Sequence, residues 1–577
     1  WKERFGAGCA DVIVGNPPWG APGVKADIEA KERHQKLLDW CKSNGKTIGD
    51  KESSQAFLWR ALDFLKENGK AAMLVSAGVL FKHNTTTQDF RSQWFNQVKL
   101  NDIFNFIHIR KFFFKSAISP FLSVCFSKGK QLDSPVYYWS AKQTINIDKT
   151  QSIVFSRYDR HILRPGDVSS VTIWKELWFG RKADTELLRF LQRKKRLQEF
   201  SYLEKCGRGY EIASKNRNAE ALQPFKSTKI ESFSRYDSLE FSNPPKKIYR
   251  LGNLNLYEGK RLLVRRGVLE KTTAKGLIVA RFENEPFCFT NALHGVKLKS
   301  AEDWEYKTIL GILWSSLTRY FFFISSSNWG LWHHEIHLHD ELLQLPMVIE
   351  KSNPATHKII SIVDKLRSYQ PKMRDLFHLD GVPGEEIEAQ RKKWEADLDD
   401  AVFELYCLNE EQMDLIRDLC EVTLPFYYNP LKSIGAMPVI EKKDLSWIEK
   451  YIHTFCRRWN AYLGEAEEMR AEVHIGAQGN MVAVEFFPSD KGDPWNFEPK
   501  DDKWGHILEQ IGKTLPHPMG TSQMIMDGIV QVVSNSGIII IKRNEKRFWT
   551  RSLAREDAGA ALCKRMIDTM PKDGKLN

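Results

Sequence analysis

The residues best suited to chemistry in this 577-residue chain are Asn16, Pro17, Pro18 and Trp19, which stand together as one tetrad. The side-chain oxygen of Asn16 and the backbone carbonyl of Pro17 can accept the two hydrogens of an exocyclic amine. The indole of Trp19 can stack on the base that carries this amine. Two acceptors turn the nitrogen lone pair toward an electrophile held in line, so the task is orientation and electrostatics and requires neither a metal ion nor a general base.

The elements around the tetrad predict how it is positioned. The apolar run Ala10–Gly15 is expected to be a short buried strand that ends at the two prolines, because proline cannot donate to a sheet. Residues 54–68 have helical apolar spacing and lead into a buried strand at 71–75, and two further strands are expected at 102–109 and 120–127. This order predicts a βαβ sheet with the tetrad at the carboxyl end of a strand.

The tetrad and the segments that follow it resemble the amino-directed DNA methyltransferases of restriction–modification and phage-defence systems, in the adenine-N6 branch. Residues 57–80 resemble the family's next helix–strand pair, and residues 111–114 with 120–126 resemble a later motif whose aromatic residue stacks on the flipped base. The resemblance implies methyl transfer from S-adenosyl-L-methionine (AdoMet) to a flipped adenine in double-stranded DNA. It assigns catalysis to Asn16, Pro17, Pro18, Trp19 and Phe114, with Asn16 and Pro17 also next to the cofactor.

The resemblance continues downstream and predicts the domain organisation. Residues 307–316 and 343–346 resemble the end of the family's target-recognition domain, and residues 398–406 resemble the helical segment that follows it. We therefore expect an α/β fold whose first three parts are the C-terminal half of a Rossmann-like methyltransferase domain at 1–150, a mixed α+β target-recognition domain at 151–350 and a helical connector at 351–440. The resemblance ends at about residue 420. Beyond it, a helix and alternating strands from about residue 442 predict a fourth part, a small α+β domain at 441–577.

One part of the family pattern is missing from its usual place. The family's glycine-rich AdoMet-binding turn precedes the Asn-Pro-Pro strand by several βα units, and residues 5–8 (Phe-Gly-Ala-Gly) lie too close to Asn16 to open such a unit. The chain starts at Trp1 rather than Met. We therefore expect an upstream methyltransferase half, or another defence-system subunit, to carry the AdoMet-binding elements, and we expect this chain alone not to methylate DNA.

Charge is distributed unevenly along the chain, whose net charge is +12. Residues 1–150 carry 22 Lys and Arg against 14 Asp and Glu, residues 151–300 carry 30 against 16, and residues 301–577 carry 33 against 43. A basic half and an acidic half predict that one half faces a polyanion. The expected DNA-phosphate contacts are Arg193, Lys194, Arg265, Arg266 and Lys271, with a solvated basic face as the alternative.

Several other sites are not expected. The nine cysteines are odd in number and form no C-x-x-C pair, which favours neither a zinc ribbon nor disulfides and is typical of a cytoplasmic protein. No apolar run approaches the roughly 18 residues that a membrane span needs. The segment from His334 to His337 is one residue short of H-E-x-x-H, so we predict no metal site, and we find no nuclease motif.

Three alternative functions remain open. The acidic second half favours a DNA-recognition or scaffold subunit of a defence complex that does not methylate. The amine of cytosine can be gripped in the same way, although Ser-Pro-Pro is commoner there in this family. The tetrad could also serve methylation of protein or ribosomal RNA. A second Asn-Pro-Pro, at Asn243, has no apolar strand before it and is interpreted as a turn.

Overall fold

The computed structural model divides the chain into two compact units. It describes residues 6–23, 26–116, 119–131, 133–212, 217–268, 276–332, 334–368, 384–441, 444–476, 479–492, 495–500, 504, 505, 507, 524–527, 530–533 and 537–569. The first unit comprises residues 1–79, 85–170 and 417–577, and the second comprises residues 80–84 and 171–416.

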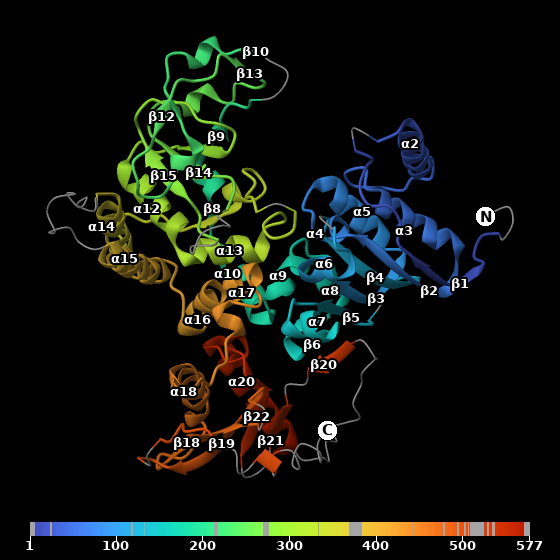
Figure 1. The fold of residues 1–577 in the computed structure, drawn as a ribbon, viewed down its shortest axis with the longest axis vertical. Helices are drawn as coiled ribbons and strands as arrows, with labels where there is room; N and C mark the ends of the chain where they lie inside the picture. The colour runs from blue at the N-terminus through green and yellow to red at the C-terminus, as the bar shows by residue number, and fades with distance from the viewer. Residues whose placement is uncertain are drawn as a thin grey trace, which may run out of the picture. The chain divides into compact units, whose positions relative to one another are not determined.

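The first unit contains a six-stranded mixed sheet in the order β1-β2-β4-β3-β5-β7 (Figure 1). Its strands are β1 (Ala10–Gly15), β2 (Leu65–Ser76), β3 (Val98–Asn105), β4 (Phe121–Lys128), β5 (Val136–Ser140) and β7 (Arg160–Leu163). β1 runs parallel to β2, and α2 (Ile28–Ser43) and α3 (Ser53–Phe64) make the crossover between them. β4 runs antiparallel to both β2 and β3, so the sheet is mixed rather than a simple βαβ repeat.

The helix before β2 ends at Phe64, earlier than its apolar spacing predicts. Strand β2 already begins at Leu65, which pairs with Ala10, and the next paired residue is Lys70. Asn68 between them has a φ of 61°. Asparagine tolerates this left-handed conformation, so the chain bulges at residues 66–69 instead of continuing the helix.

Strand β1 is an edge strand rather than the buried strand that its apolar sequence predicts. Among the described residues, β2 is the strand that pairs with β1. Val12 and Val14 are consequently 66% and 79% exposed. A continuous apolar run is typical of strands that are covered on both faces, and here the described part of the chain leaves that cover incomplete.

The turn-rich stretch near residue 150 does not separate two compact units. β6 (Ile153–Ser156) pairs in parallel with β20 (Met524–Asp527), so residues 151–170 belong to the first unit together with the C-terminal part of the chain. The hydroxyl of Tyr158 donates to Asp557 at 3.2 Å. These contacts place residues 151–170 in the first unit, although a division at residue 150 was expected, because they join this segment to one far away in sequence.

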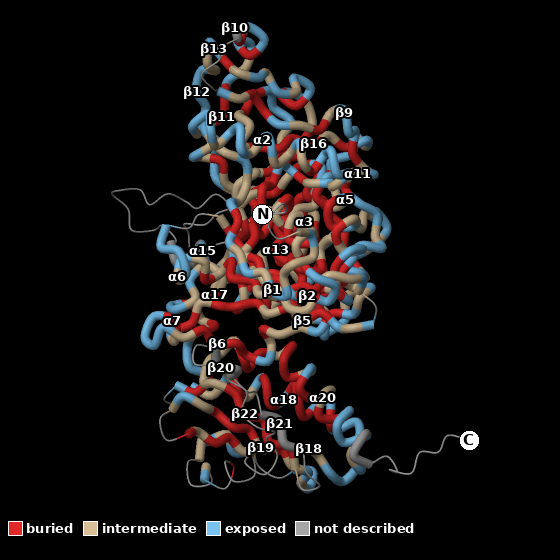
Figure 2. The backbone as a smooth tube through the Cα atoms, turned by 90° about the vertical axis from the view of Figure 1, so that its right-hand side faces the viewer, coloured by how far each residue is buried: buried red, intermediate tan, exposed pale blue. Residues whose placement is uncertain are grey.

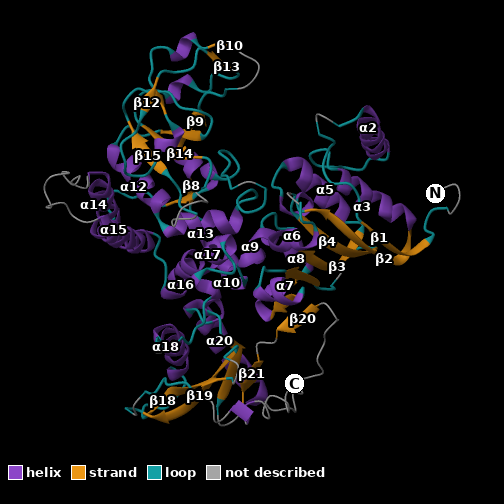
Figure 3. Ribbon diagram, in the orientation of Figure 1, coloured by secondary structure: helices purple, strands orange, loops and turns teal. Residues whose placement is uncertain are grey.

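The C-terminal part of the first unit has a four-stranded antiparallel sheet, drawn in orange beside the labels β18, β19 and β21 in Figure 3. The order of its strands is β18-β19-β22-β21. Its strands are β18 (Glu467–Ile475), β19 (Met481–Asp490), β21 (Val530–Val533) and β22 (Ile538–Arg543). Helices α18 (Ser446–Asn460) and α20 (Arg551–Thr569) share a core with this sheet, in which Phe455 stacks on Phe486. This is the α+β mixture expected from the alternating pattern.

The second unit combines an antiparallel sheet with packed helices. The sheet order is β15-β14-β16-β9, with strands β9 (Ser201–Arg208), β14 (Arg261–Arg265), β15 (Ala280–Glu283) and β16 (Leu293–Leu298). Its longer helices are α10 (Lys182–Gln192), α12 (Asp303–Trp314), α13 (Ser316–Ser325), α14 (Pro354–Ser368) and α15 (Gly384–Leu405). A Cβ on Gly311 would lie 2.3 Å from Ile359, so this glycine allows α12 and α14 to approach closely.

Within the described residues, none of the helices taken singly has the length and apolar character needed to cross a membrane. The pair α12 and α13 meets those criteria by length and composition when taken together, with a bend of 62° between them. Most residues of both helices are buried within the second unit, as Figure 2 shows for α13.

Lys175 makes the stability of the second unit depend on pH. Its Nζ donates to the carbonyl of Trp329 at 2.7 Å, and burial lowers the pKa of Lys175 from 10.5 to about 7. Between about pH 7 and pH 10 the unfolded chain therefore binds more protons than the folded one, so stability rises with pH in this window. We expect the melting temperature of Lys175→Met, measured by scanning calorimetry, to increase less between pH 7 and pH 10 than the melting temperature of the wild type. Identical pH profiles for the two proteins would contradict the assignment.

Candidate functional site

The tetrad leaves the six-stranded sheet at the carboxyl ends of two parallel strands. β1 ends at Gly15, which pairs with Met73 of β2, and residues 16–19 continue as an irregular loop. Asn16 and Pro18 are exposed, Pro17 is buried and Trp19 is half-buried. The carboxyl ends of parallel strands are where open α/β sheets bind ligands, and Asn16 stands there with its amide accessible.

Glu52 holds the far end of this loop. Its buried carboxylate accepts the N–H of Gly20 at 2.6 Å and caps α3 by accepting the hydroxyl and N–H of Ser54 at 2.9 and 3.3 Å. The hydroxyl of Ser53 donates to the carbonyl of Gly20 at 2.7 Å. The first turn of α3 therefore fixes the backbone just after Trp19. Sequence reasoning missed Glu52, although an acidic residue just before a helix is favourably placed against the helix dipole.

Trp19 is held as a fixed platform. Its indole N–H donates to the carbonyl of Leu74 at 3.1 Å. One face of the ring stacks on the fully buried Phe121, with 5.2 Å between ring centroids and 22° between the planes. A hydrogen bond and a stacked ring together determine the orientation of the indole.

The structure brings Phe114 to the edge of this platform. The rings of Trp19 and Phe114 lie 6.1 Å apart at 80°, and Phe114 also lies edge-on to Phe121 at 5.4 Å. Phe114 follows the short helix α6 (Arg110–Phe113) and is 37% exposed. Two parallel rings that sandwich a base must lie about 7 Å apart, twice the usual contact distance. With 80° between their planes, Trp19 and Phe114 do not have this arrangement, because Phe114 lies beside the Trp19–Phe121 stack. A base would stack between Trp19 and Phe114 only if Phe114 changed its position.

His108 anchors the segment that carries Phe114. Its Nδ1 accepts the N–H of Gln143 at 3.1 Å, and its Nε2 lies 3.1 Å from the carbonyl of Tyr427 in α17 (Leu424–Tyr428). These partners require the neutral ring with its proton on Nε2. Burial lowers the pKa of His108 to about 3, so the ring stays neutral at physiological pH. His108 acts here as an anchor rather than as a proton-transfer group.

The side chains expected to contact DNA differ in their exposure and in whether they already interact with another side chain. Arg193 is exposed at the end of α10, and the ammonium of Lys194 lies 4.8 Å from the ring of Phe190. Arg265 is half-buried, and Arg266 forms a 2.6 Å ion pair with Glu335. Lys271 lies outside the described residues. Arg266 would have to exchange a carboxylate for a phosphate, whereas Arg193 can reach one directly.

A groove in the second unit contains two arginines that the sequence did not single out. The groove has a volume of about 430 Å³, and the exposed Arg208 and Arg250 lie on it with Asn253, Asn291, His337 and His339. A Cβ on Gly252 would lie 2.6 Å from the backbone of Gly209, so glycine at this position allows the walls to meet. Arginine and asparagine are among the side chains that contact DNA phosphates and base edges.

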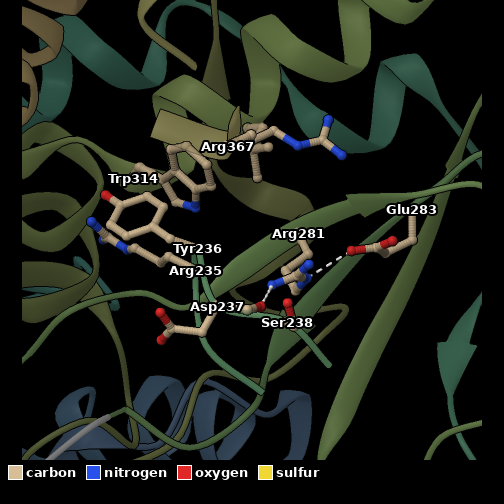
Figure 4. Close-up of a pocket in the computed structure, with 9 residues that line it drawn as sticks. Arg235, Tyr236, Asp237, Ser238, Arg281, Glu283, Trp314 and Arg367 are labelled. Atoms are coloured by element: carbon tan, nitrogen blue, oxygen red, sulfur yellow. Dashed lines mark hydrogen bonds and ion pairs between the residues drawn. The ribbon is translucent and has the colours of Figure 1, made fainter. Parts of the chain in front are cut away.

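A smaller pocket of about 130 Å³ is lined by Arg235, Arg281 and Arg367 (Figure 4). Arg281 donates to Glu283 at 2.7 Å and to the carbonyl of Asp237 at 2.8 Å. Arg235 and Arg367 each donate to a backbone carbonyl, at 2.7 and 2.9 Å. Because these guanidinium groups already have protein acceptors, their role is to hold the neighbouring loop and strands together.

Residues 1–113 match the family model described as Eco57I restriction-modification methylase. This match supports the resemblance to restriction–modification methylases that the tetrad indicates, and it covers the tetrad, α3 and β2. Among curated proteins, no sequence matches the chain.

The chain is similar to three solved restriction–modification structures. The Type IIL enzyme MmeI in complex with DNA has 12% identity and a TM-score of 0.40, over 73% of this chain and 57% of that one. The type IIG restriction endonuclease BpuSI has 13% identity and a TM-score of 0.29, over 70% and 55%. The DrdV–DNA complex has 12% identity and a TM-score of 0.37, over 64% and 46%. The chain thus spans about half the length of these proteins.

Proposed function

We propose that this chain is part of a site-specific DNA methyltransferase of a restriction–modification or phage-defence system. It transfers a methyl group from AdoMet to the exocyclic amine of a flipped adenine. The observation that carries the proposal is the Asn16-Pro17-Pro18-Trp19 loop at the carboxyl end of β1, with the indole of Trp19 fixed by Leu74 and Phe121. The match of residues 1–113 to a methylase family supports it.

The loop performs the reaction by gripping the amine. The side-chain oxygen of Asn16 and the carbonyl of Pro17 accept its two hydrogens, so the nitrogen lone pair turns out of conjugation. AdoMet supplies an electrophilic methyl group on its sulfonium. The methylated amine then loses one proton to water. Trp19 and Phe114 stack on the flipped base, and roughly 1–3 kcal/mol per stacked base offsets an unstacking cost of a few kcal/mol.

Asn16 and Pro17 fit the methyl end of AdoMet, because an exposed amide and a carbonyl at a strand end can face both the amine and the donor. The turn at Gly6–Gly8 does not fit a separate cofactor loop. The N–H of Gly8 donates to the carbonyl of Asp63 at 3.0 Å, and the turn leads straight into β1. We therefore assign the rest of the AdoMet site to other elements.

The exposed edge of β1 supports an AdoMet-binding partner half, supplied by an upstream segment or by another defence-system subunit. Val12 and Val14 are more than half exposed on a strand whose sequence is typical of a sheet interior. A strand added beside β1 would pair its open backbone edge, and an element of the same partner packed on the sheet face would cover these side chains.

Double-stranded DNA is the proposed macromolecular substrate. Arg193, Lys194, Arg265, Arg266 and Lys271 supply positive charge for its phosphates, and the groove with Arg208 and Arg250 adds candidates for reading base edges. The basic character of residues 1–300 supports this proposal.

AdoMet binding is the experiment that tests the function. Calorimetry should detect AdoMet with this chain and its AdoMet-binding half together, and radiolabelled methyl groups should then appear on DNA as N6-methyladenine. Detection of N4-methylcytosine would instead identify cytosine as the target base. Absence of AdoMet binding in the combined sample would favour the DNA-recognition or scaffold role instead.

A further inference from the structure

Three metal-ligating side chains converge on one face of the C-terminal sheet. Glu472 and His474 are two residues apart on β18, so they point to the same face. Glu485 on β19 is directly paired with Glu472. One ligand atom from each of the three residues lies within 4.8 Å of the others.

His474 is the side chain that distinguishes this cluster from an ordinary acidic patch. It is fully buried, and neither of its ring nitrogens has a hydrogen-bond partner. Its Nε2 faces both carboxylates, at 3.6 Å from Glu485 and 3.9 Å from Glu472. Buried polar groups in proteins are almost always satisfied, so an imidazole aimed between two carboxylates without a hydrogen bond indicates an additional ligand.

The charges in the cluster also favour a cation. Two carboxylates placed directly opposite each other on antiparallel strands repel. Lys500 lies 2.9 Å from Oε1 of Glu472, while the other oxygen, Oε2, faces His474. The backbone of Lys500 is paired with β18 through Val473 and Ile475, which brings its side chain beside Glu472.

The spacing of the ligand atoms matches a small divalent ion. Tetrahedral Zn²⁺ with bonds of about 2.1 Å keeps its ligand atoms about 3.4 Å apart. The contacts of 3.6 and 3.9 Å would have to close by a few tenths of an ångström. A protonated imidazole bonded to the carboxylates would instead bring its N–H within hydrogen-bond distance of an oxygen.

We infer that Glu472, His474 and Glu485 bind a divalent transition-metal ion of the Zn²⁺ class. One imidazole and two carboxylates suit Zn²⁺ better than Mg²⁺, which prefers oxygen ligands alone. The ion would join β18 to β19 and replace the repulsion between the two carboxylates with shared coordination. This site is additional to the methyl-transfer loop, and its test does not depend on methylation.

The test is a metal titration of the full chain after dialysis against a chelator. ZnCl₂ should bind by calorimetry and raise the melting temperature, since a ligand that binds only the folded state stabilises it. CoCl₂ should give the visible absorption bands of a low-coordinate nitrogen–oxygen site. Absence of Zn²⁺ and Co²⁺ binding by the wild-type chain would overturn the proposal.

Variants test whether the ion binds at His474 and not at another histidine of the chain. Even residues that merely orient a metal ligand are worth about 10- to 100-fold in affinity. His474→Ala and the isosteric Glu485→Gln should each weaken Zn²⁺ binding at the assigned site by at least that factor. His453→Ala, which removes an exposed histidine of the same domain, should leave it unchanged. Equal Zn²⁺ and Co²⁺ binding by the wild type and both ligand variants would overturn the assignment, even if one variant folds poorly.

Discussion

Replacing Asn16 with alanine should lower methyl transfer by about a hundredfold to a thousandfold, the usual cost of removing one preorganised hydrogen-bonding group at a reacting centre. The amine would keep a single acceptor, the carbonyl of Pro17, and its lone pair would no longer be held toward the methyl donor. Asn16 is exposed, so its loss should leave the fold intact and DNA affinity within about twofold. Single-turnover assays measure the transfer rate, and binding titrations measure the DNA affinity. Both use this chain together with the half that binds AdoMet.

The second Asn-Pro-Pro of the chain provides a matched control. Asn243 is also exposed, but its side-chain oxygen accepts from Lys226 at 3.1 Å in the second unit. Asn243→Ala should therefore leave the transfer rate unchanged. If Asn16→Ala lost DNA binding together with transfer, or if both alanine variants behaved alike, the catalytic assignment of Asn16 would be wrong.

Replacing Phe114 with alanine should slow transfer by about 5- to 150-fold, the equivalent of the roughly 1–3 kcal/mol that one stacked base contributes. The ring is more than a third exposed and meets Trp19 edge-on, so little packing is lost with it. The flipped base would be less well held, and 2-aminopurine placed at the target position should show a smaller population of the flipped state by fluorescence.

Phe113 is the control for this experiment. It is the preceding residue, is 42% exposed and packs on Phe106 with 4.7 Å between ring centroids. Phe113→Ala should affect stability more than flipping. A Phe113 variant with the larger flipping defect, or a Phe114 variant with normal fluorescence and rate, would move the stacking role away from Phe114.

Local sequence predicted the parts of the site that lie close together along the chain. Two prolines after an apolar run must end a strand, so the position of the Asn16–Trp19 loop at the end of β1 followed from residue types alone. The same reasoning placed α3 before β2 but misjudged its end, because the left-handed turn at Asn68 depends on pairing with β1. It also predicted wrongly that β1 is buried. An apolar run indicates that a strand favours burial, but it does not show whether other elements of the chain cover that strand.

The sequence by itself therefore determined which functional groups the site contains. These are an amide, a rigid carbonyl and an aromatic ring on one loop, in a basic N-terminal half. Only the tertiary structure decided what holds and surrounds them. Three contacts join residues that are distant in sequence: the hydrogen bond from Gly20 to Glu52, the stacking of Trp19 on Phe121, and the contact between His108 and Tyr427. Glu472, His474 and Glu485 have no recognisable spacing and meet through the register of β18 and β19. Local patterns specify the conformation of a segment, whereas such contacts depend on how separate segments pair and pack.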